Sequence, residues 1–216
     1  MIRVKNVNIS DNTIKLFKRL EKFNDQDYNK KMLTKDPEWK SSLIKDIIGS
    51  LCIDNGIEGL ERDHIILDTS IDGNGEWNEE DKTLKLYFNT DMTMTAELTR
   101  TILHEFRHIW QHMHSEFFDE VMQKNLGSSF DISYIEYLIQ PVEVDTDNFA
   151  LATLRELNAI FKDKDIEEVM KRESSELELG RSYRIHVLKT QGYVANDKYF
   201  SKLLDFRSDV LHISIG

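Results

Sequence analysis

The spacing of apolar residues changes along the chain, and each spacing predicts a different element. In residues 1–10 apolar and polar positions alternate weakly, which is typical of a short strand or an extended arm. From residue 11 to about residue 23 apolar side chains recur every three or four positions, as on one face of a helix. Ser10 or Asp11 is the expected N-cap, because both side chains can accept a hydrogen bond from the first turn.

A second helix is expected from Pro37 to about Asn55-Gly56. Proline suits a first helical turn, and glycine commonly follows a last one. The single cysteine of the chain, Cys52, lies in an apolar stretch of this helix and is expected in the core. The other expected buried positions are Trp39, Leu43, Ile44, Ile47, Ile48 and Leu51.

The middle of the chain favours short strands. Residues 65–67 and the surroundings of Trp77 predict two of them, and residues 83–89 predict the best strand in the chain. In that segment Leu84, Leu86 and Phe88 alternate with polar or amphipathic residues, as in a sheet with one buried face. Turn-forming residues separate the three segments. We therefore expect a small antiparallel sheet.

Helical patterns dominate the remaining sequence. No glycine or proline occurs between Met92 and Leu126, so a long helix is expected there, with Thr93 or Thr95 as its cap and Glu97 in its first turn. Further helical patterns cover residues 117–126, 132–139, 142–161 and 165–179, and two strand-like segments follow in the tail. The expected fold class is α+β, helix-rich, with the small sheet preceding the long helix. One domain is expected over residues 1–216, with a helical region at 1–60, a core at 61–162 and a C-terminal region at 163–216.

The composition of the chain disfavours several classes of function. The formal net charge of −11 disfavours binding to nucleic acid or to an anionic membrane, because both need a clustered positive surface. A single cysteine excludes an intrachain disulfide, which fits a reducing cytosol. The first residues show neither a signal peptide nor a membrane span. A cytoplasmic protein is therefore expected.

The long helix contains the most specific chemical pattern, an H-E-x-x-H pentad from His104 to His108. Residues four apart lie on one face of a helix, so the two histidines can present their imidazoles to one zinc ion. Glu105 is rotated to one side, where it can take a proton from a water molecule that zinc activates. The pentad fixes only three positions, and chance matches on charged helices are common.

A catalytic zinc site usually needs a third protein ligand, and the sequence offers two candidates. His114 completes the spacing of the metzincins, but those proteins have glycine at the position of Gln111. That glycine lets the chain turn so that the last histidine returns to the metal. On an unbroken helix, His114 points to a different face.

The other candidate is Glu143, on a downstream helix that Pro141 can start. Asp147 follows one turn later and could accept a hydrogen bond from the non-metal nitrogen of His104 or His108. An acidic, solvated helix face is the simpler interpretation of these carboxylates. The apolar residues that follow them favour a packed helix instead: Phe149, Ala150, Leu151 and Leu154.

H-E-x-x-H followed by E-x-x-x-D on a later helix resembles the gluzincin metallopeptidases, to which thermolysin belongs. Residues 141–150 are also similar to the P-x-E-x-E-A-x-x-F-A pattern of ImmA/IrrE-type peptidases and related phage metallopeptidases. The likeness covers about residues 65–154 and departs from the pattern at Thr146, where alanine is usual. It implies that His104, His108 and Glu143 bind Zn²⁺, that Glu105 is the general base and that Asp147 orients a ligand.

The expected function is that of a zinc-dependent endopeptidase that hydrolyses peptide bonds in an intracellular protein. The resemblance implies a repressor or another regulatory protein as substrate, lying extended along an edge formed by residues 83–89. A further residue would stabilise the oxyanion. Two alternatives remain: a non-catalytic zinc-containing regulatory or binding module, and a helical interaction protein without metal. The tail offers four candidates for the oxyanion role: Tyr183, Arg184, His186 and His212.

Overall fold

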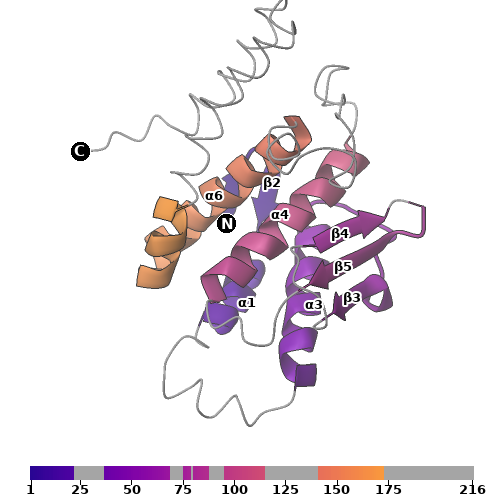
Figure 1. Cartoon of the computed structure of the whole chain (residues 1–216), viewed down its shortest axis with the longest axis horizontal. Helices are drawn as coiled ribbons and strands as arrows, with labels where there is room; N and C mark the ends of the chain where they lie inside the picture. The colour runs from indigo at the N-terminus through magenta and orange to yellow at the C-terminus, as the bar shows by residue number, and fades with distance from the viewer. Residues whose placement is uncertain (22–36, 69–74, 79, 88–94, 115–140, 173–216) are drawn as a thin grey trace, which may run out of the picture.

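The fold is built around one long helix, α4 (Thr95–Met113), which carries the whole pentad. In this computed structural model, the described residues are 1–21, 37–68, 75–78, 80–87, 95–114 and 141–172. Helix α4 lies between α6 (Pro141–Phe161) on one side and a three-stranded sheet on the other, and it also contacts two N-terminal helices (Figure 1). Its apolar stripe is fully buried at Ile102, Leu103, Phe106 and Ile109. The α+β, helix-rich fold class is confirmed.

The sheet is mixed rather than purely antiparallel. Its strand order is β3-β5-β4, so the last strand in sequence lies in the middle. The β4–β5 pair is antiparallel, as expected, whereas β3 runs parallel to β5. Alternation in sequence reveals which face of a strand is buried, but it does not reveal its neighbour or direction. The strands are β3 (Ile65–Asp68), β4 (Gly75–Asn78) and β5 (Thr83–Tyr87).

The expectation that residues 83–89 form a sheet edge is wrong. β5 pairs with a strand on each side, and its residues Leu84 and Leu86 are fully buried. Alternation shows that one face of a segment is buried, which is equally true of an edge strand and of a central strand. The edge strand that packs against α4 is β4 (Figure 1).

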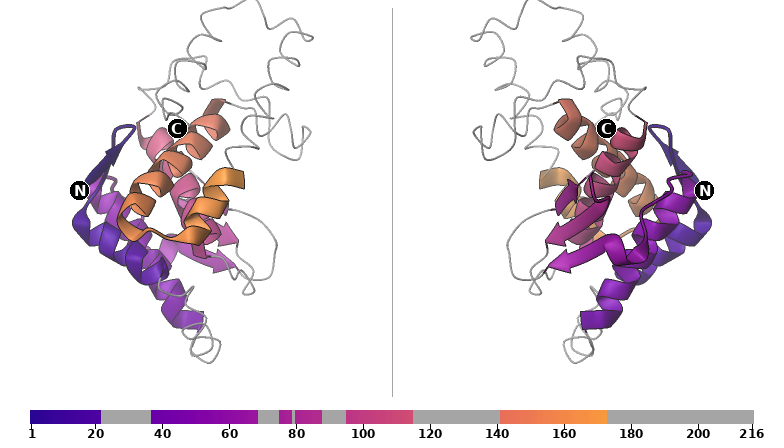
Figure 2. Two further views of the ribbon diagram at one scale, coloured as in Figure 1. Left: turned by 90° about the vertical axis from the view of Figure 1, so that its left-hand side faces the viewer. Right: turned by 90° about the vertical axis from the view of Figure 1, so that its right-hand side faces the viewer.

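The first ten residues form a hairpin, where a single strand or arm was expected. Strands β1 (Ile2–Val4) and β2 (Val7–Ile9) pair antiparallel, and Lys5 and Asn6 between them have φ values of 45° and 67°. Two adjacent residues with positive φ suit the tight turn that matches strand twist. Figure 2 shows this hairpin next to the N-terminal helices.

Helix α3 (Pro37–Asp54) confirms the predicted boundaries and packs against both the hairpin and α4. Gly56, just beyond its end, has φ of 65°, a conformation that glycine adopts without strain. The side-chain amide of Asn55 exchanges two hydrogen bonds, of 2.8 and 2.9 Å, with the backbone of Asn8 and so joins helix and hairpin. Cys52 is buried, as predicted, and burial raises the pKa of its thiol to about 12.

Ser10, and not Asp11, caps α1 (Asp11–Glu21): its Oγ accepts a hydrogen bond of 3.2 Å from the backbone N–H of Thr13. We expect Ser10→Ala to lower the free energy of unfolding by about 1 kcal/mol, the usual contribution of such a cap. Urea unfolding in the presence of a chelator measures the difference. Lys18→Ala, an exposed change on the same helix, is the control; equal stability of the two variants would contradict the capping role.

Helix α6 ends at Phe161, where Lys162 has φ of 57°, and a further helix covers residues 164–172. Asp163 caps that helix by accepting hydrogen bonds from the backbone of the first turn. An ion pair of 2.6 Å between Arg172 and Glu97 joins it to the start of α4. None of the helices within the described residues combines the length and apolar character that a membrane span requires. The expected helices at 117–126 and 132–139, the strand-like tail segments and Phe88 lie outside the described residues.

Candidate metal centre

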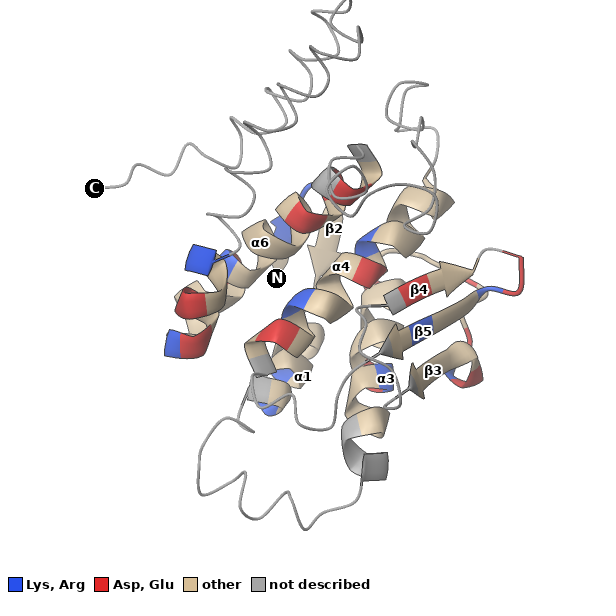
Figure 3. Ribbon diagram, in the orientation of Figure 1, with Lys and Arg blue, Asp and Glu red and all other residues tan. Residues whose placement is uncertain are grey.

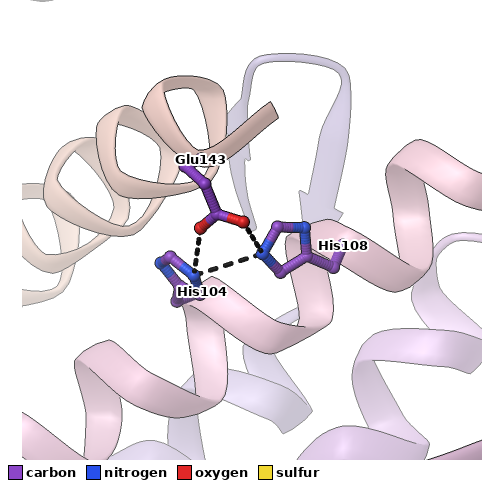
Figure 4. A group of neighbouring side chains, drawn as sticks. All are labelled: His104, His108 and Glu143. Atoms are coloured by element: carbon purple, nitrogen blue, oxygen red, sulfur yellow. Dashed lines mark hydrogen bonds and ion pairs between the residues drawn. The ribbon is translucent and has the colours of Figure 1, made fainter. Parts of the chain in front are cut away.

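His104 and His108, one turn apart on α4, converge with Glu143 from the first turn of α6 (Figure 4). The two imidazole Nε2 atoms lie 3.2 Å apart. Glu143 approaches them through its two oxygens, at 3.3 Å from Nε2 of His104 and at 3.5 Å from Nε2 of His108. Among the described residues, these three side chains form the group that could hold a metal ion. The sequence-predicted ligands are therefore brought together.

The spacing of the two imidazole nitrogens fits a tetrahedral zinc ion. With zinc–nitrogen and zinc–oxygen bonds of about 2.0–2.1 Å, neighbouring ligand atoms of a tetrahedral site are about 3.3 Å apart. The two Nε2 atoms, 3.2 Å apart, and the Glu143 oxygen that lies 3.3 Å from Nε2 of His104 have separations close to that value, while the other Glu143 oxygen lies 3.5 Å from Nε2 of His108. One ligand atom from each of the three residues lies within 4.8 Å of the others. Two histidines and one carboxylate also form a donor set that catalytic zinc uses, with a fourth position left for water.

The hydrogen bonds around the imidazoles leave both Nε2 atoms available as ligands. Nδ1 of His104 lies 2.9 Å from a carboxylate oxygen of Asp147, so Nδ1 carries the proton and donates it. Nδ1 of His108 lies 3.1 Å from Oε1 of Gln111. Two imidazole nitrogens facing each other at 3.2 Å need positive charge between them, either a proton on one nitrogen or a metal ion. The arrangement therefore fits a metal ion between the rings.

The charges of the site also favour a cation. Burial alone would lower the pKa of His104, but its contacts with Asp147 and Glu143 outweigh burial and raise that pKa to about 10. Burial alone would raise the pKa of Glu143, but its contacts with His104 and His108 hold it well below its usual range. Both shifts arise because buried carboxylates stabilise positive charge at the imidazoles.

Glu105 is buried within the centre of the fold, with 3 % of its surface exposed. Burial raises the pKa of its carboxyl group, and the nearby charges of His104 and His108 oppose this effect only in part. Glu105 does not belong to the metal-holding group, although it is close enough to be influenced by all three members. The expected position of Glu105 beside the ligand face, and its role as general base, stay predictions.

Two ion pairs join α4 to α6 at the site, and Figure 3 shows basic positions on α4 and acidic positions on α6. Arg107 binds Asp145 through two nitrogens at 2.7 and 3.3 Å, and both side chains are buried. Arg100 lies 3.0 Å from the same Asp147 oxygen that accepts from His104. The roles of Asp145 and Arg100 were missed, because only the packing of two distant helices shows which charges face each other.

His114 is not part of the metal-holding group. Its ring stacks on Trp110, with centroids 4.4 Å apart, and Nδ1 donates to the Trp110 carbonyl oxygen at 3.0 Å. Helix α4 continues through Gln111 to Met113, as expected for a sequence without glycine at that point. His112 is half-buried and also lies outside the group. The four oxyanion candidates of the tail lie outside the described residues.

Replacement of Asp147 by alanine removes the acceptor that orients His104. We expect Asp147→Ala to weaken zinc binding about 10–100-fold, the usual effect of losing such a partner. Competition with a chromophoric chelator measures the affinity. Glu156→Ala, which removes an exposed acid from the same helix, is the matched control. Equal affinity in the two variants would mean that Asp147 contributes nothing to zinc binding.

Comparison with known proteins gives no relative for this chain. No protein-family model, no curated protein and no solved structure matches it. The chemistry of the centre is therefore inferred from its donor atoms, distances and charges.

Proposed function

We propose that this chain is a zinc-dependent endopeptidase of gluzincin type, which hydrolyses peptide bonds in a protein substrate. The observation that carries the proposal is the convergence of His104, His108 and Glu143, with one ligand atom of each within 4.8 Å of the others and Glu105 buried nearby. A chance pentad on a charged helix gives no reason for a carboxylate from another helix to meet both imidazoles. The order of the ligands and of Asp147 along the chain also resembles that of the gluzincins.

Zinc is the metal we propose, because two imidazoles and one carboxylate form a donor set that suits it. When bound, zinc supplies Lewis acidity, which lowers the pKa of water and polarises a carbonyl group. The protein side chains hold the imidazoles with their Nε2 atoms directed at the metal position. Asp147 fixes His104 for this purpose, through the bond of 2.9 Å to Nδ1.

Glu105 is the proposed general base. It would accept a proton from the attacking water and deliver it to the nitrogen of the leaving amine. A base works best when its pKa lies near the working pH, and burial moves the pKa of Glu105 upward from the ordinary glutamate value. The same burial keeps bulk water from competing for the carboxylate.

Strand β4 is the proposed platform for the substrate backbone. It is an edge strand, pairs with β5 within the described sheet and packs against α4 (Figure 1). An extended peptide could add along the outer side of β4 through main-chain hydrogen bonds, which confer little sequence preference. This assignment replaces the central strand β5, whose two edges are both occupied.

We further propose a cytosolic setting and a regulatory protein as substrate. A chain with one buried cysteine is compatible with a reducing compartment, since it forms no intrachain disulfide. The choice of a regulatory protein comes from the likeness of residues 141–150 to the ImmA/IrrE-type pattern.

The test combines metal content with hydrolysis. Protein purified without added zinc is analysed for its elements, and its digestion of casein is compared with that by Glu105→Gln. A peptidase contains zinc and loses hydrolysis in the variant. If the wild type contains zinc, hydrolyses no protein and binds a protein partner tightly, the binding-module function would be correct and the peptidase function wrong. Absence of metal affinity would favour a metal-free interaction protein.

A further inference from the structure

We propose that Gln111 is the positioning residue for His108, and that its side-chain amide couples the direction of this ligand to the helix that carries Glu143. The inference rests on the proposed zinc site and adds a residue to it. Gln111 lies one turn after His108 on α4 and is 7 % exposed. Its amide has three polar neighbours within hydrogen-bond distance, one on α4 and two on α6.

The neighbours of the amide determine its orientation. One end faces the carbonyl oxygen of Val142 at 3.0 Å and a carboxylate oxygen of Asp145 at 2.9 Å. Both groups are acceptors, so this end is the NH₂ group. The other end is therefore Oε1, and it accepts a hydrogen bond from Nδ1 of His108 at 3.1 Å. The amide thereby places the His108 proton on Nδ1 and leaves Nε2 as the metal-binding atom.

The same amide holds the first turn of α6. Val142 immediately precedes Glu143, and Asp145 lies two residues after it. Arg107 binds the Asp145 carboxylate from the other side at 2.7 Å, which neutralises this charge next to the amide. A shift of α6 would therefore move both Glu143 and the group that orients His108.

The two imidazoles are consequently held by different chemistry. His104 donates to the carboxylate of Asp147, which strengthens the imidazole as a ligand through its charge. His108 donates to a neutral amide, which sets the direction of the ring and the position of its proton without adding a negative charge. Loss of Gln111 should therefore disturb the geometry at His108 and leave the bond between His104 and Asp147 intact.

Gln111→Met and Gln111→Glu test the inference together. Methionine has a similar size and offers no strong acceptor, so we expect zinc affinity to fall about 10–100-fold. Glutamate retains an acceptor for His108 but loses the N–H donors toward α6, so it should keep more affinity than methionine. A merely structural role predicts the reverse order, because a carboxylate would repel Asp145. Thr153→Val, a buried and nearly isosteric change on α6, is the control and should bind zinc as the wild type does.

Nuclear magnetic resonance of the imidazoles separates a local change at His108 from unfolding, because the Nδ1–H signal of His104 should persist in a folded variant. In the zinc-loaded wild type both histidines should carry their proton on Nδ1, and the Nδ1–H signal of His108 alone should disappear in Gln111→Met. A His108 ring with its proton on Nε2 in the wild type would overturn the role of Gln111. So would equal zinc affinity of Gln111→Met and the wild type. Failure of the wild type to bind zinc would instead overturn the proposed metal site.

Discussion

Glu143→Ala should lower the affinity for zinc by a larger factor than loss of a residue that only hydrogen-bonds to a ligand. The latter loss typically lowers the affinity about 10–100-fold. The wild type is expected to bind a single zinc ion per chain. Glu143 provides the only carboxylate of the metal-holding group, with oxygens at 3.3 and 3.5 Å from the two imidazole nitrogens. Its removal leaves two ligands, where a catalytic zinc site needs three, and takes away the negative charge that stabilises the cation. Elemental analysis after dialysis measures the loss of occupancy.

His114→Ala is the matched control for this experiment. It removes a histidine from α4, but one that stacks on Trp110 and does not belong to the metal-holding group. Zinc occupancy should stay close to that of the wild type. Should His114→Ala empty the site while Glu143→Ala leaves it filled, the metzincin-like ligand set would be the right one, and the assignment of α6 to the metal centre would be wrong.

Glu105→Gln should retain zinc and lose peptide hydrolysis by about 10²–10⁴-fold, the range expected when a general base is removed. Glutamine keeps the size of the side chain and its ability to form hydrogen bonds, but it cannot take up a proton at neutral pH. Glu105 lies outside the metal-holding group, which is why the zinc content should not change. The rate of casein digestion, measured beside the zinc content of the same samples, separates the two effects.

The control for Glu105→Gln is Glu97→Gln, the same change two turns earlier on α4, where the carboxylate pairs with Arg172. It should digest casein at the wild-type rate. Loss of zinc from Glu105→Gln would mean that Glu105 is itself a ligand. Retention of zinc with an unchanged rate would exclude Glu105 as the base.

The local features of this protein were determined by the sequence itself. The four-residue spacing of His104 and His108 fixes their common face on any unbroken helix. Pro37 fixes the start of α3, and the alternation of residues 83–87 fixes which side of β5 is buried. These features depend on periodicity and on side chains a few residues apart, so short segments suffice to predict them.

Only the tertiary structure decided which segments meet. The approach of α6 to α4 brings Glu143 to the imidazoles, pairs Asp145 with Arg107 and gives Gln111 its role. Likewise, sheet pairing places β5 at the centre and β3 parallel to it. Apart from the motif that predicts Glu143 as a ligand, the spacing in sequence carries no information about these contacts, because they depend on how separate apolar faces pack and on which buried charges then face each other.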